Sequence, residues 1–259
     1  MTDSDEKDSE LELARLRAAL DREVERSFDL EKSLNRANAG FEEFVSIAAH
    51  NLREPLRDVA SNSQLMTEVF SEHLDSEACV LLQRISESAR KAQSILTAIV
   101  DYWAADSADH QIGPTSLEAV LTQALCITDD AIVKTGAIIT HEPLPEVLCD
   151  FTTLAKVFHH LIRNAIEYSG TPVPRIFISA RRDADEWIIS VQDHGAGIEA
   201  AFQNRIFGVF KRLHGKDYPG DGLGLAYCRK AIEWQGGRLW VKSTPDSGAT
   251  FSFTLAPAD

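Results

Sequence analysis

The C-terminal part of the chain contains the group Asp193-His194-Gly195-Ala196-Gly197, followed by Gly220-Asp221-Gly222-Leu223-Gly224 and Ser247-Gly248-Ala249-Thr250. Ten of the 14 glycines lie between Gly195 and Gly248. Glycine lets the backbone approach a ligand closely and leaves N–H groups free for phosphate, although tight turns require it as well. The second group leads directly into a helical pattern, and a helix N-terminus favours anions. Taken one by one, the three groups therefore fit either tight turns or a site for a phosphorylated ligand.

Helical and strand patterns surround these glycines in one mixed domain. Because helices and strands do not alternate one for one, we expect an α+β sandwich with one layer of each, spanning 117–259. The polar segment 107–116 is expected to be the linker before it. The helices are expected at 117–134, 152–168 and 223–235, and the strands at 137–141, 175–182, 187–192, 238–242 and 250–255.

Residues 41–106 show the pattern of a helical hairpin with its turn near His73–Ser76. On the second arm, apolar residues follow alternating steps of four and three, which mark the face of a helix in a bundle. Two helices alone cannot bury both stripes, so we expect a homodimer in which two hairpins form a four-helix bundle. The stripes consist of Phe41, Phe44, Ala48, Leu52, Leu56, Val59, Met66 and Phe70, and of Ala78, Leu82, Ile85, Ala89, Ala92, Leu96, Ile99 and Trp103.

Residues 1–40 are charged and rich in helix-forming residues. From Leu13 onward, the heptad positions are mostly apolar and continue into Phe41, which indicates a parallel coiled coil that runs into the hairpin. Glu23 and Ser27 interrupt this seam, so a single solvated helix is the alternative. The first ten residues carry no such pattern, and we expect them to be disordered.

The chain has 259 residues, and its 26 basic and 40 acidic side chains give it a net charge of −14. Such a charge disfavours binding to nucleic acid or to an anionic membrane surface. No apolar run reaches the roughly 18–20 residues of a membrane span, and the acidic N-terminus does not resemble a signal peptide. The four cysteines contain no CxxC pair. We therefore expect reduced thiols, no zinc site and a cytoplasmic protein.

The order of the motifs is more specific than any one of them. A helix that contains Asn164 comes before the three glycine groups, and Ile206-Phe207-Gly208-Val209-Phe210 lies between the first two groups. This series resembles the N, G1, F, G2 and G3 boxes of the histidine kinase ATP-binding domain, which belongs to the Bergerat-fold ATPases. The segment Phe44-Val45-Ser46-Ile47-Ala48-Ala49-His50-Asn51-Leu52-Arg53-Glu54-Pro55-Leu56-Arg57 resembles the H-box. The resemblance covers residues 41–257 and is greatest to the phytochrome-type branch.

The resemblance implies roles for particular residues in binding ATP and Mg²⁺. Asn164 would hold the metal ion, whose preferred ligands are oxygens, and Asp193 would accept a hydrogen bond from the adenine amino group. Residues 208–222 would form a lid over the triphosphate, anchored by Phe207 and Phe210. The candidate nucleotide-binding residues are Asn164, Asp193, Gly195, Gly197, Phe207, Phe210, Lys211, Arg212, Gly220, Gly222, Leu223, Gly224 and Thr250.

The resemblance also implies the reaction of a two-component sensor histidine kinase core. His50 would accept the γ-phosphoryl group, because a neutral imidazole is a good nucleophile near pH 7. Asn51 and Arg53 are further catalytic candidates. The phosphoryl group would then pass to an aspartate in the receiver domain of a response regulator. A signal would enter through the N-terminal coil from an upstream sensor domain or a partner protein.

Departures from the family pattern leave other interpretations open. Asn51 stands where an acidic residue usually lies beside the acceptor, and Glu167 stands where a basic residue often meets phosphate. These two residues favour the alternative of a degenerate kinase that acts as a dimeric scaffold for nucleotide and regulator. His160 stands where Asn or Glu is commoner, and Glu54 argues against phosphatase activity. A Bergerat-fold ATPase or serine kinase without the histidine step is disfavoured by the H-box.

Overall fold

The computed structural model of the protein describes residues 2–71, 73–106, 111–211 and 221–258. The chain divides into two compact units, Met1–Asn51 and Leu52–Asp259, which are described in turn.

The first unit is the N-terminal part of one helix, α1 (Thr2–Val69). Residues 2–10, which we expected to be disordered, are helical instead. Large apolar side chains further along the helix, such as Leu20 and Phe28, are exposed in the single chain.

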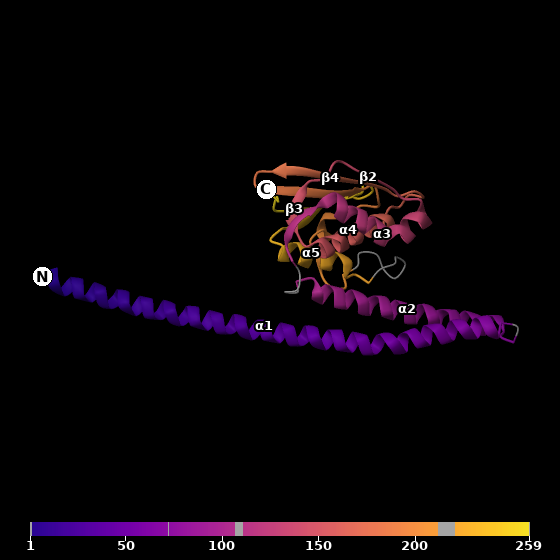
Figure 1. Ribbon diagram of the computed structural model, residues 1–259, viewed down its shortest axis with the longest axis horizontal. Coiled ribbons are helices and arrows are strands. Elements are labelled where there is room, and N and C mark those ends of the chain that lie inside the picture. Colours follow the sequence, from indigo (N-terminus) through magenta and orange to yellow (C-terminus); the bar gives the residue numbers. More distant parts are fainter. Residues whose placement is uncertain (1, 72, 107–110, 212–220, 259) are drawn as a thin grey trace. The chain divides into compact units, whose positions relative to one another are not determined.

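The second unit begins with a hairpin, formed by the C-terminal part of α1 and by α2 (Ser76–Ala104) (Figure 1). Asp75 caps α2 by accepting a hydrogen bond from the Ala78 N–H at 2.7 Å. The connection therefore occupies 70–75, slightly earlier than the predicted turn. The two arms meet through small side chains: Ser86 Oγ donates to the Ala60 carbonyl at 3.3 Å, and Ala89 is buried.

Many large apolar side chains of the hairpin remain exposed in the single chain. Monomeric proteins rarely leave a contiguous apolar face in contact with water. The exposed residues are Leu52, Val59, Leu65, Met66, Val69, Phe70, Val80, Leu81 and Ile85.

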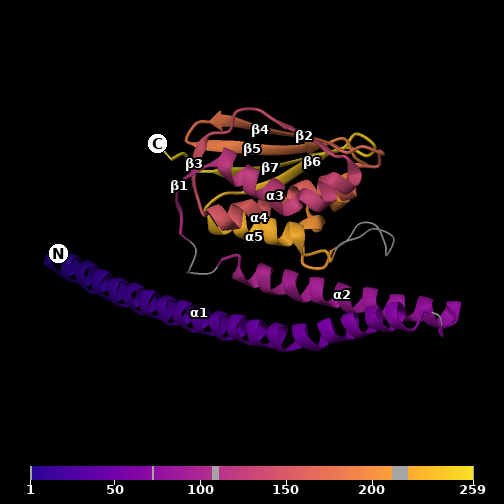
Figure 2. The same ribbon diagram turned by 45° about the vertical axis from the view of Figure 1, so that its right-hand side comes forward.

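The rest of the second unit is a sandwich of one sheet and one layer of helices (Figure 2). The sheet has the order β2-β4-β5-β7-β6, and all neighbours are antiparallel except β2 and β4. The predicted α+β sandwich and its three helices and five strands are confirmed. The strands are β2 (Ile138–His141), β4 (Arg175–Asp183), β5 (Glu186–Asp193), β6 (Leu239–Ser243) and β7 (Ala249–Leu255), and the helices are α3 (Leu117–Thr135), α4 (Phe151–Glu167) and α5 (Gly224–Trp234).

The sequence analysis missed two short strands that form a separate antiparallel pair, β1 (Gly113–Ser116) and β3 (Glu146–Cys149). Strand β1 lies in the segment that we expected to be linker, so the linker prediction was wrong for 113–116. Four residues with Gly113 and Pro114 carry no alternating pattern, and the strand exists because it pairs with a distant segment. Two 3₁₀ turns, η1 (Ala200–Phe202) and η2 (Arg205–Phe207), complete the elements.

Helix α4 is the centre of the core. Phe158, on its inner face, is fully buried and meets the ring of Phe253 on β7 edge to face, with 5.7 Å between centroids. Such aromatic pairs contribute about 1 kcal/mol beyond the area that they bury. The apolar stripe of α4 therefore joins the helical layer to the middle of the sheet.

The last turn of α2 contacts the helical layer through two lysines. Lys156 Nζ on α4 lies 2.6 Å from Asp101 Oδ1. Lys230 Nζ on α5 lies 2.7 Å from Asp106 Oδ1 and donates to the carbonyls of Tyr102 at 3.2 Å and Trp103 at 3.4 Å. Because the last carbonyls of a helix have no intrahelical donors, Lys230 caps the C-terminal end of α2.

We expect Lys230→Met to lower the free energy of unfolding by about 1–2 kcal/mol, because it removes a charged donor from half-buried carbonyls and keeps the aliphatic stem. Urea unfolding followed by circular dichroism measures the change. Lys242→Met, at an exposed position on β6, is the matched control and should change the free energy by less than about 0.5 kcal/mol. Equal stability of the two variants would show that the cap contributes nothing.

Candidate nucleotide-binding site

Asp193 is the last residue of β5 and is only 8% exposed. Its Oδ1 atom accepts hydrogen bonds from the Gly195 N–H at 2.8 Å and the Ala249 N–H at 3.1 Å. Burial raises the pKa of this carboxyl above its ordinary value, although the two N–H groups act in the opposite direction. Within the described ranges, Oδ2 has no hydrogen-bond partner, so one carboxylate oxygen is left to accept a bond from a ligand.

The glycines of the first and third groups let backbone segments pack against each other beside Asp193. A Cβ at Gly195 would lie 2.2 Å from the Tyr168 carbonyl oxygen, and one at Gly248 would lie 2.1 Å from the Asp193 carbonyl oxygen. A Cβ at Gly197 would lie 2.1 Å from the Thr244 carbonyl oxygen. Glycine is therefore required at these positions because other backbone segments pack against them. These contacts bring the end of α4, the end of β5 and the start of β7 together.

Asn164 lies on α4, half-buried, and its side-chain amide has no hydrogen-bond partner among the residues that the structure describes. Glu167, whose negative charge would repel a phosphate, forms an ion pair with Arg163, and the distance between Oε1 and Nε is 2.7 Å. An amide oxygen without a protein partner fits a ligand for Mg²⁺, which prefers oxygen. No cluster of three or more His, Cys, Asp and Glu side chains that could hold a metal ion occurs in the described part of the chain.

His160 lies one helical turn before Asn164 and faces the start of α5. Its ring centroid is 5.1 Å from that of Tyr227, and a Cβ at Gly224 would be 3.0 Å from its Nδ1 atom. Burial, followed by the positive groups around it, lowers the pKa of His160 to about 3, so the imidazole is neutral at physiological pH. In the sequence, His160 stands out only as a departure from the family pattern, and no motif points to Tyr227.

The second glycine group forms the N-terminal end of α5. Gly222 has φ +75° and packs on the Phe210 backbone, while Leu223 is buried and its N–H donates to Asp221 Oδ1 at 3.0 Å. The helix then begins at Gly224, so its first N–H groups are the free donors that a helix N-terminus presents.

The two aromatic residues of the predicted lid anchor differ. Phe207 is buried, meets Phe251 edge to face at 6.3 Å and lies under the Arg229 guanidinium. Phe210 is 56% exposed with φ +58°, so it is not buried as Phe207 is, and its role as a lid anchor stays a prediction. Lys211 is exposed, and Thr250 lies half-buried on β7.

Arg212 and Gly220, two further predicted nucleotide-binding residues, lie outside the described residues. The predicted catalytic residues lie on α1, where His50, Asn51 and Arg53 are all exposed. His50 and Asn51 belong to the first unit, whereas Arg53 belongs to the second, and its carbonyl accepts a hydrogen bond from Gln93 on α2 at 3.3 Å.

All four cysteines are free. None of the described helices is both long enough and apolar enough to cross a membrane.

We expect Gly248→Ala to destabilise the protein by more than about 3 kcal/mol, because the new methyl group would overlap the Asp193 carbonyl. Gly236→Ala is the matched control: Gly236 has φ +79°, close to the +78° of Gly248, but nothing lies within 4 Å of its Cβ position. In the control, the free energy of unfolding should fall by only about 1 kcal/mol, which is the cost of an alanine in the left-handed conformation. Urea unfolding of both variants measures the difference, and similar losses would disprove the close approach.

Comparison with known proteins gives the family. Residues 149–259 match the family described as histidine kinase-, DNA gyrase B-, and HSP90-like ATPase. Cyanobacterial phytochrome A of Nostoc sp. is 39% identical over 235 residues, which are 90% of this chain and 31% of that protein. The chain therefore spans about a third of the length of this relative.

Two solved structures share the fold. Full-length ShkA in complex with AMPPNP has a TM-score of 0.64 at 24% identity, over 83% of this chain and 46% of that chain. The histidine kinase ThkA in complex with the response regulator protein TrrA has a TM-score of 0.56 at 22% identity, over 83% of this chain and 61% of that chain. Residues 149–259 thus form an ATPase domain of the histidine kinase-, DNA gyrase B- and HSP90-like family, and the chain is a homologue of phytochrome-type and other sensor histidine kinases.

Proposed function

We propose that this chain is the core of a two-component sensor histidine kinase, which binds ATP with Mg²⁺ and transfers the γ-phosphoryl group to His50. The observation that carries the proposal is the buried carboxylate of Asp193, with one oxygen held by two backbone N–H groups and the other without a partner in the described chain. The family match and the AMPPNP bound to the structural neighbour ShkA support the same ligand.

The adenine end of the site is Asp193. Its Oδ1 atom is occupied by the Gly195 and Ala249 N–H groups, so the open Oδ2 atom accepts from the adenine amino group. A hydrogen bond to an ionised acceptor in a buried site is about twice as strong as a neutral one. Gly197 and Thr250 belong to the two loops that frame this carboxylate.

The phosphate end is formed by α4 and the start of α5. The free N–H groups at Gly224 favour the anionic phosphates, and Asn164 supplies an oxygen ligand to the metal ion. Bound Mg²⁺ neutralises charge on the phosphates and orients them. Lys211, Arg212 and Gly220 are proposed to complete the phosphate contacts from the lid.

Transfer begins when the lone pair on a His50 ring nitrogen attacks the γ-phosphorus in line. A P–N bond forms as the bond to the β,γ-bridging oxygen breaks, ADP leaves with that electron pair, and the proton on the other ring nitrogen passes to water. Asn51 has no basic group, so it orients the ring rather than taking the proton. Arg53 lies three residues further along the helix, close enough for its charge to face the transferred group.

The partners complete the proposal. The apolar side chains exposed along α1 and α2 support a homodimer with a four-helix bundle, and the heptads before them support a parallel coiled coil. Phosphohistidine would pass its phosphoryl group to an aspartate of a response regulator, as the ThkA complex with TrrA suggests. An upstream sensor domain or partner protein supplies the signal, and we propose that the reaction takes place in the cytoplasm.

The scaffold alternative keeps one of its two supports. Glu167 pairs with Arg163 and is therefore not an isolated negative charge beside the proposed phosphate site. Asn51 remains, and an amide there slows the loss of the imidazole proton without preventing nucleotide binding. Phosphorylation assays separate the two functions, whereas binding assays do not.

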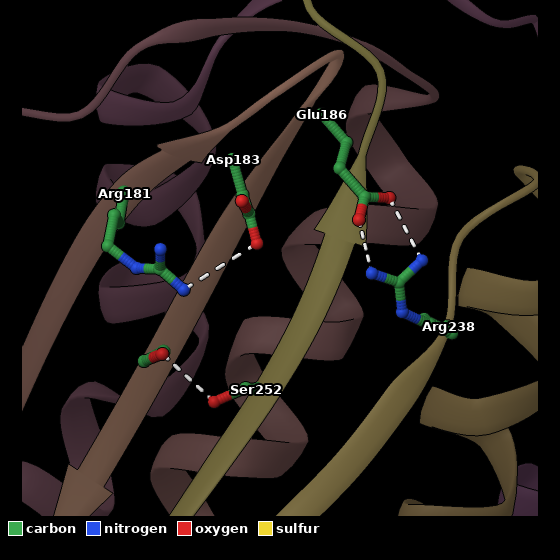
Figure 3. Close-up of polar contacts among 6 residues, drawn as sticks. Arg181, Asp183, Glu186, Arg238 and Ser252 are labelled. Carbon is green, nitrogen blue, oxygen red and sulfur yellow. Dashed lines mark hydrogen bonds and ion pairs between the residues drawn. The ribbon is translucent and has the colours of Figure 1, made fainter.

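We expect Asp193→Asn to weaken AMPPNP binding about 100-fold while the domain stays folded. The asparagine oxygen can still accept from Gly195 and Ala249, but its NH₂ group then faces the adenine amino group, and two donors meet. Isothermal titration calorimetry measures the affinity. The matched control is Glu186→Gln at the other end of β5, where the carboxylate pairs with Arg238 (Figure 3). Unchanged affinity in Asp193→Asn would remove the adenine contact.

We expect the wild-type protein, incubated with γ-labelled ATP and Mg²⁺, to carry a label that is lost in acid and stable in base. His50→Gln should carry none and should bind AMPPNP as tightly as the wild type, because His50 is not among the residues proposed to bind the nucleotide. A label on both proteins would assign the acceptor elsewhere. If neither protein is labelled and both bind nucleotide, the scaffold function holds instead.

A further inference from the structure

We propose that the hydroxyl group of Ser243 orients the peptide group whose N–H holds Asp193, and that Ser243 thereby sets how strongly the site selects for adenine. This peptide group joins Gly248 to Ala249 at the start of β7. Ser243 is a positioning residue in this account, because it acts through the peptide group and does not contact the nucleotide. The inference rests on the proposed function and adds a residue that determines its specificity.

The first reason is the bond that Ser243 makes to this peptide group. Ser243 is the last residue of β6 and lies directly opposite Ala249 on β7, and its Oγ atom donates to the Gly248 carbonyl at 2.6 Å. At the other end of the same peptide group, the Ala249 N–H donates to Asp193 Oδ1 at 3.1 Å. The carbonyl and the N–H of a planar trans peptide point in opposite directions. A bond that fixes the carbonyl therefore also fixes the N–H.

The second reason is the backbone of Gly248. Its φ is +78°, and glycine permits more backbone conformations than any other residue. The Gly248 N–H donates to the Gly195 carbonyl at 3.0 Å, which restrains the peptide group before Gly248 rather than the one after it. The Ser243 hydroxyl restrains the following peptide group. Hydrogen bonds at both ends of one peptide also polarise each other, which strengthens the bond to Asp193.

The third reason is that the same hydroxyl holds the loop on the other side of Asp193. The Ile198 N–H donates to Ser243 Oγ at 2.8 Å, and Ile198 ends the loop whose Gly195 N–H is the second donor to Asp193. A hydroxyl has one hydrogen to donate and lone pairs to accept with, so Ser243 uses both functions. Gln203 Nε2 strengthens the link, because it donates to the Ser243 carbonyl at 2.8 Å and to the Ile198 carbonyl at 3.1 Å.

The hydroxyl group therefore contacts both segments that supply a donor to Asp193. In the proposed function, Oδ1 is held by these donors and Oδ2 accepts from the adenine amino group. If the Ala249 N–H turns away, the carboxylate loses one of the two bonds that set its orientation, and its contact with the amino group weakens. The phosphates bind at the start of α5, so their contacts do not depend on Ser243. The expected effect is a loss of selectivity for the amino group rather than a general loss of nucleotide binding.

The experiment compares ADP with purine riboside 5′-diphosphate, which is the same nucleotide without the amino group. Isothermal titration calorimetry with Mg²⁺ and the full chain measures both affinities, and the wild type should bind ADP more tightly. We expect Ser243→Ala to lower the affinity for ADP about tenfold and to leave the affinity for the analogue unchanged. The matched control is Ser252→Ala, which removes another serine hydroxyl from the sheet, 2.9 Å from Ser190 Oγ (Figure 3), and should change neither affinity.

Ser243→Ala should stay folded, because backbone hydrogen bonds still join the two loops. The Asp246 N–H donates to the Ala196 carbonyl at 2.8 Å, and the bond between Gly248 and Gly195 also remains. Circular dichroism checks the fold. If Ser243→Ala unfolds, Ser243→Cys takes its place, because a thiol fills the same space and is only a weak donor. The cysteine variant should show the same loss of selectivity.

Two results in a folded variant would overturn the inference and leave the proposed function intact. One is an equal loss of affinity for ADP and for the analogue, which would make Ser243 a merely structural residue. The other is wild-type affinity for both nucleotides. A wild type that binds neither nucleotide, or binds both equally, would instead remove the adenine contact of Asp193, and the inference would fall with it.

Discussion

Two hydrogen bonds to one oxygen of Asp193 organise the candidate site. They join the end of β5 to the loop at Gly195 and to the first residue of β7, and they require the backbone segments to approach more closely than any side chain would allow. The two carboxylate oxygens therefore differ: Oδ1 accepts hydrogen bonds from the protein backbone, and Oδ2 is left for a ligand. Because the group is buried, leaving Oδ2 without a hydrogen bond costs free energy, and a ligand that donates to it removes that cost.

The sandwich was predictable because its elements repeat a simple period. The stripe of α4 and the strands β4, β5 and β7 are long enough for helical and alternating patterns to be read from the sequence. Strands β1 and β3 have four residues each. They form because they pair with each other, from Gly113 with Cys149 to Ser116 with Glu146, and no local sequence pattern predicts such a pairing. The helical start of α1 was not predicted for another reason: its first ten residues carry no apolar seam, although charged residues alone can favour a helix end.

The residues of the site were easier to identify than their physical roles. The glycine groups predicted a ligand site at Asp193 and at the start of α5, whereas the structure shows that Gly195 and Gly248 are required by neighbouring backbone. Phe207 and Phe210 look equivalent in the sequence, but the Phe210 side chain is exposed, whereas Phe207 is buried and packs on Phe251. Contacts of this kind depend on tertiary geometry, so a motif names the residues without telling which side each one faces.

Helix α5 connects two features that were described separately. Its first residue, Gly224, lies against His160 at the candidate phosphate site, and Lys230, fewer than two turns later, caps the last turn of α2. A helix of this length moves as one body, because its hydrogen-bonded turns resist bending. Any ligand that shifts the start of α5 must therefore also shift Lys230, or else strain its contacts with Asp106 and the α2 carbonyls. The candidate nucleotide site and the end of the hairpin are therefore linked by one helix, through Gly224 at its start and Lys230 further along it.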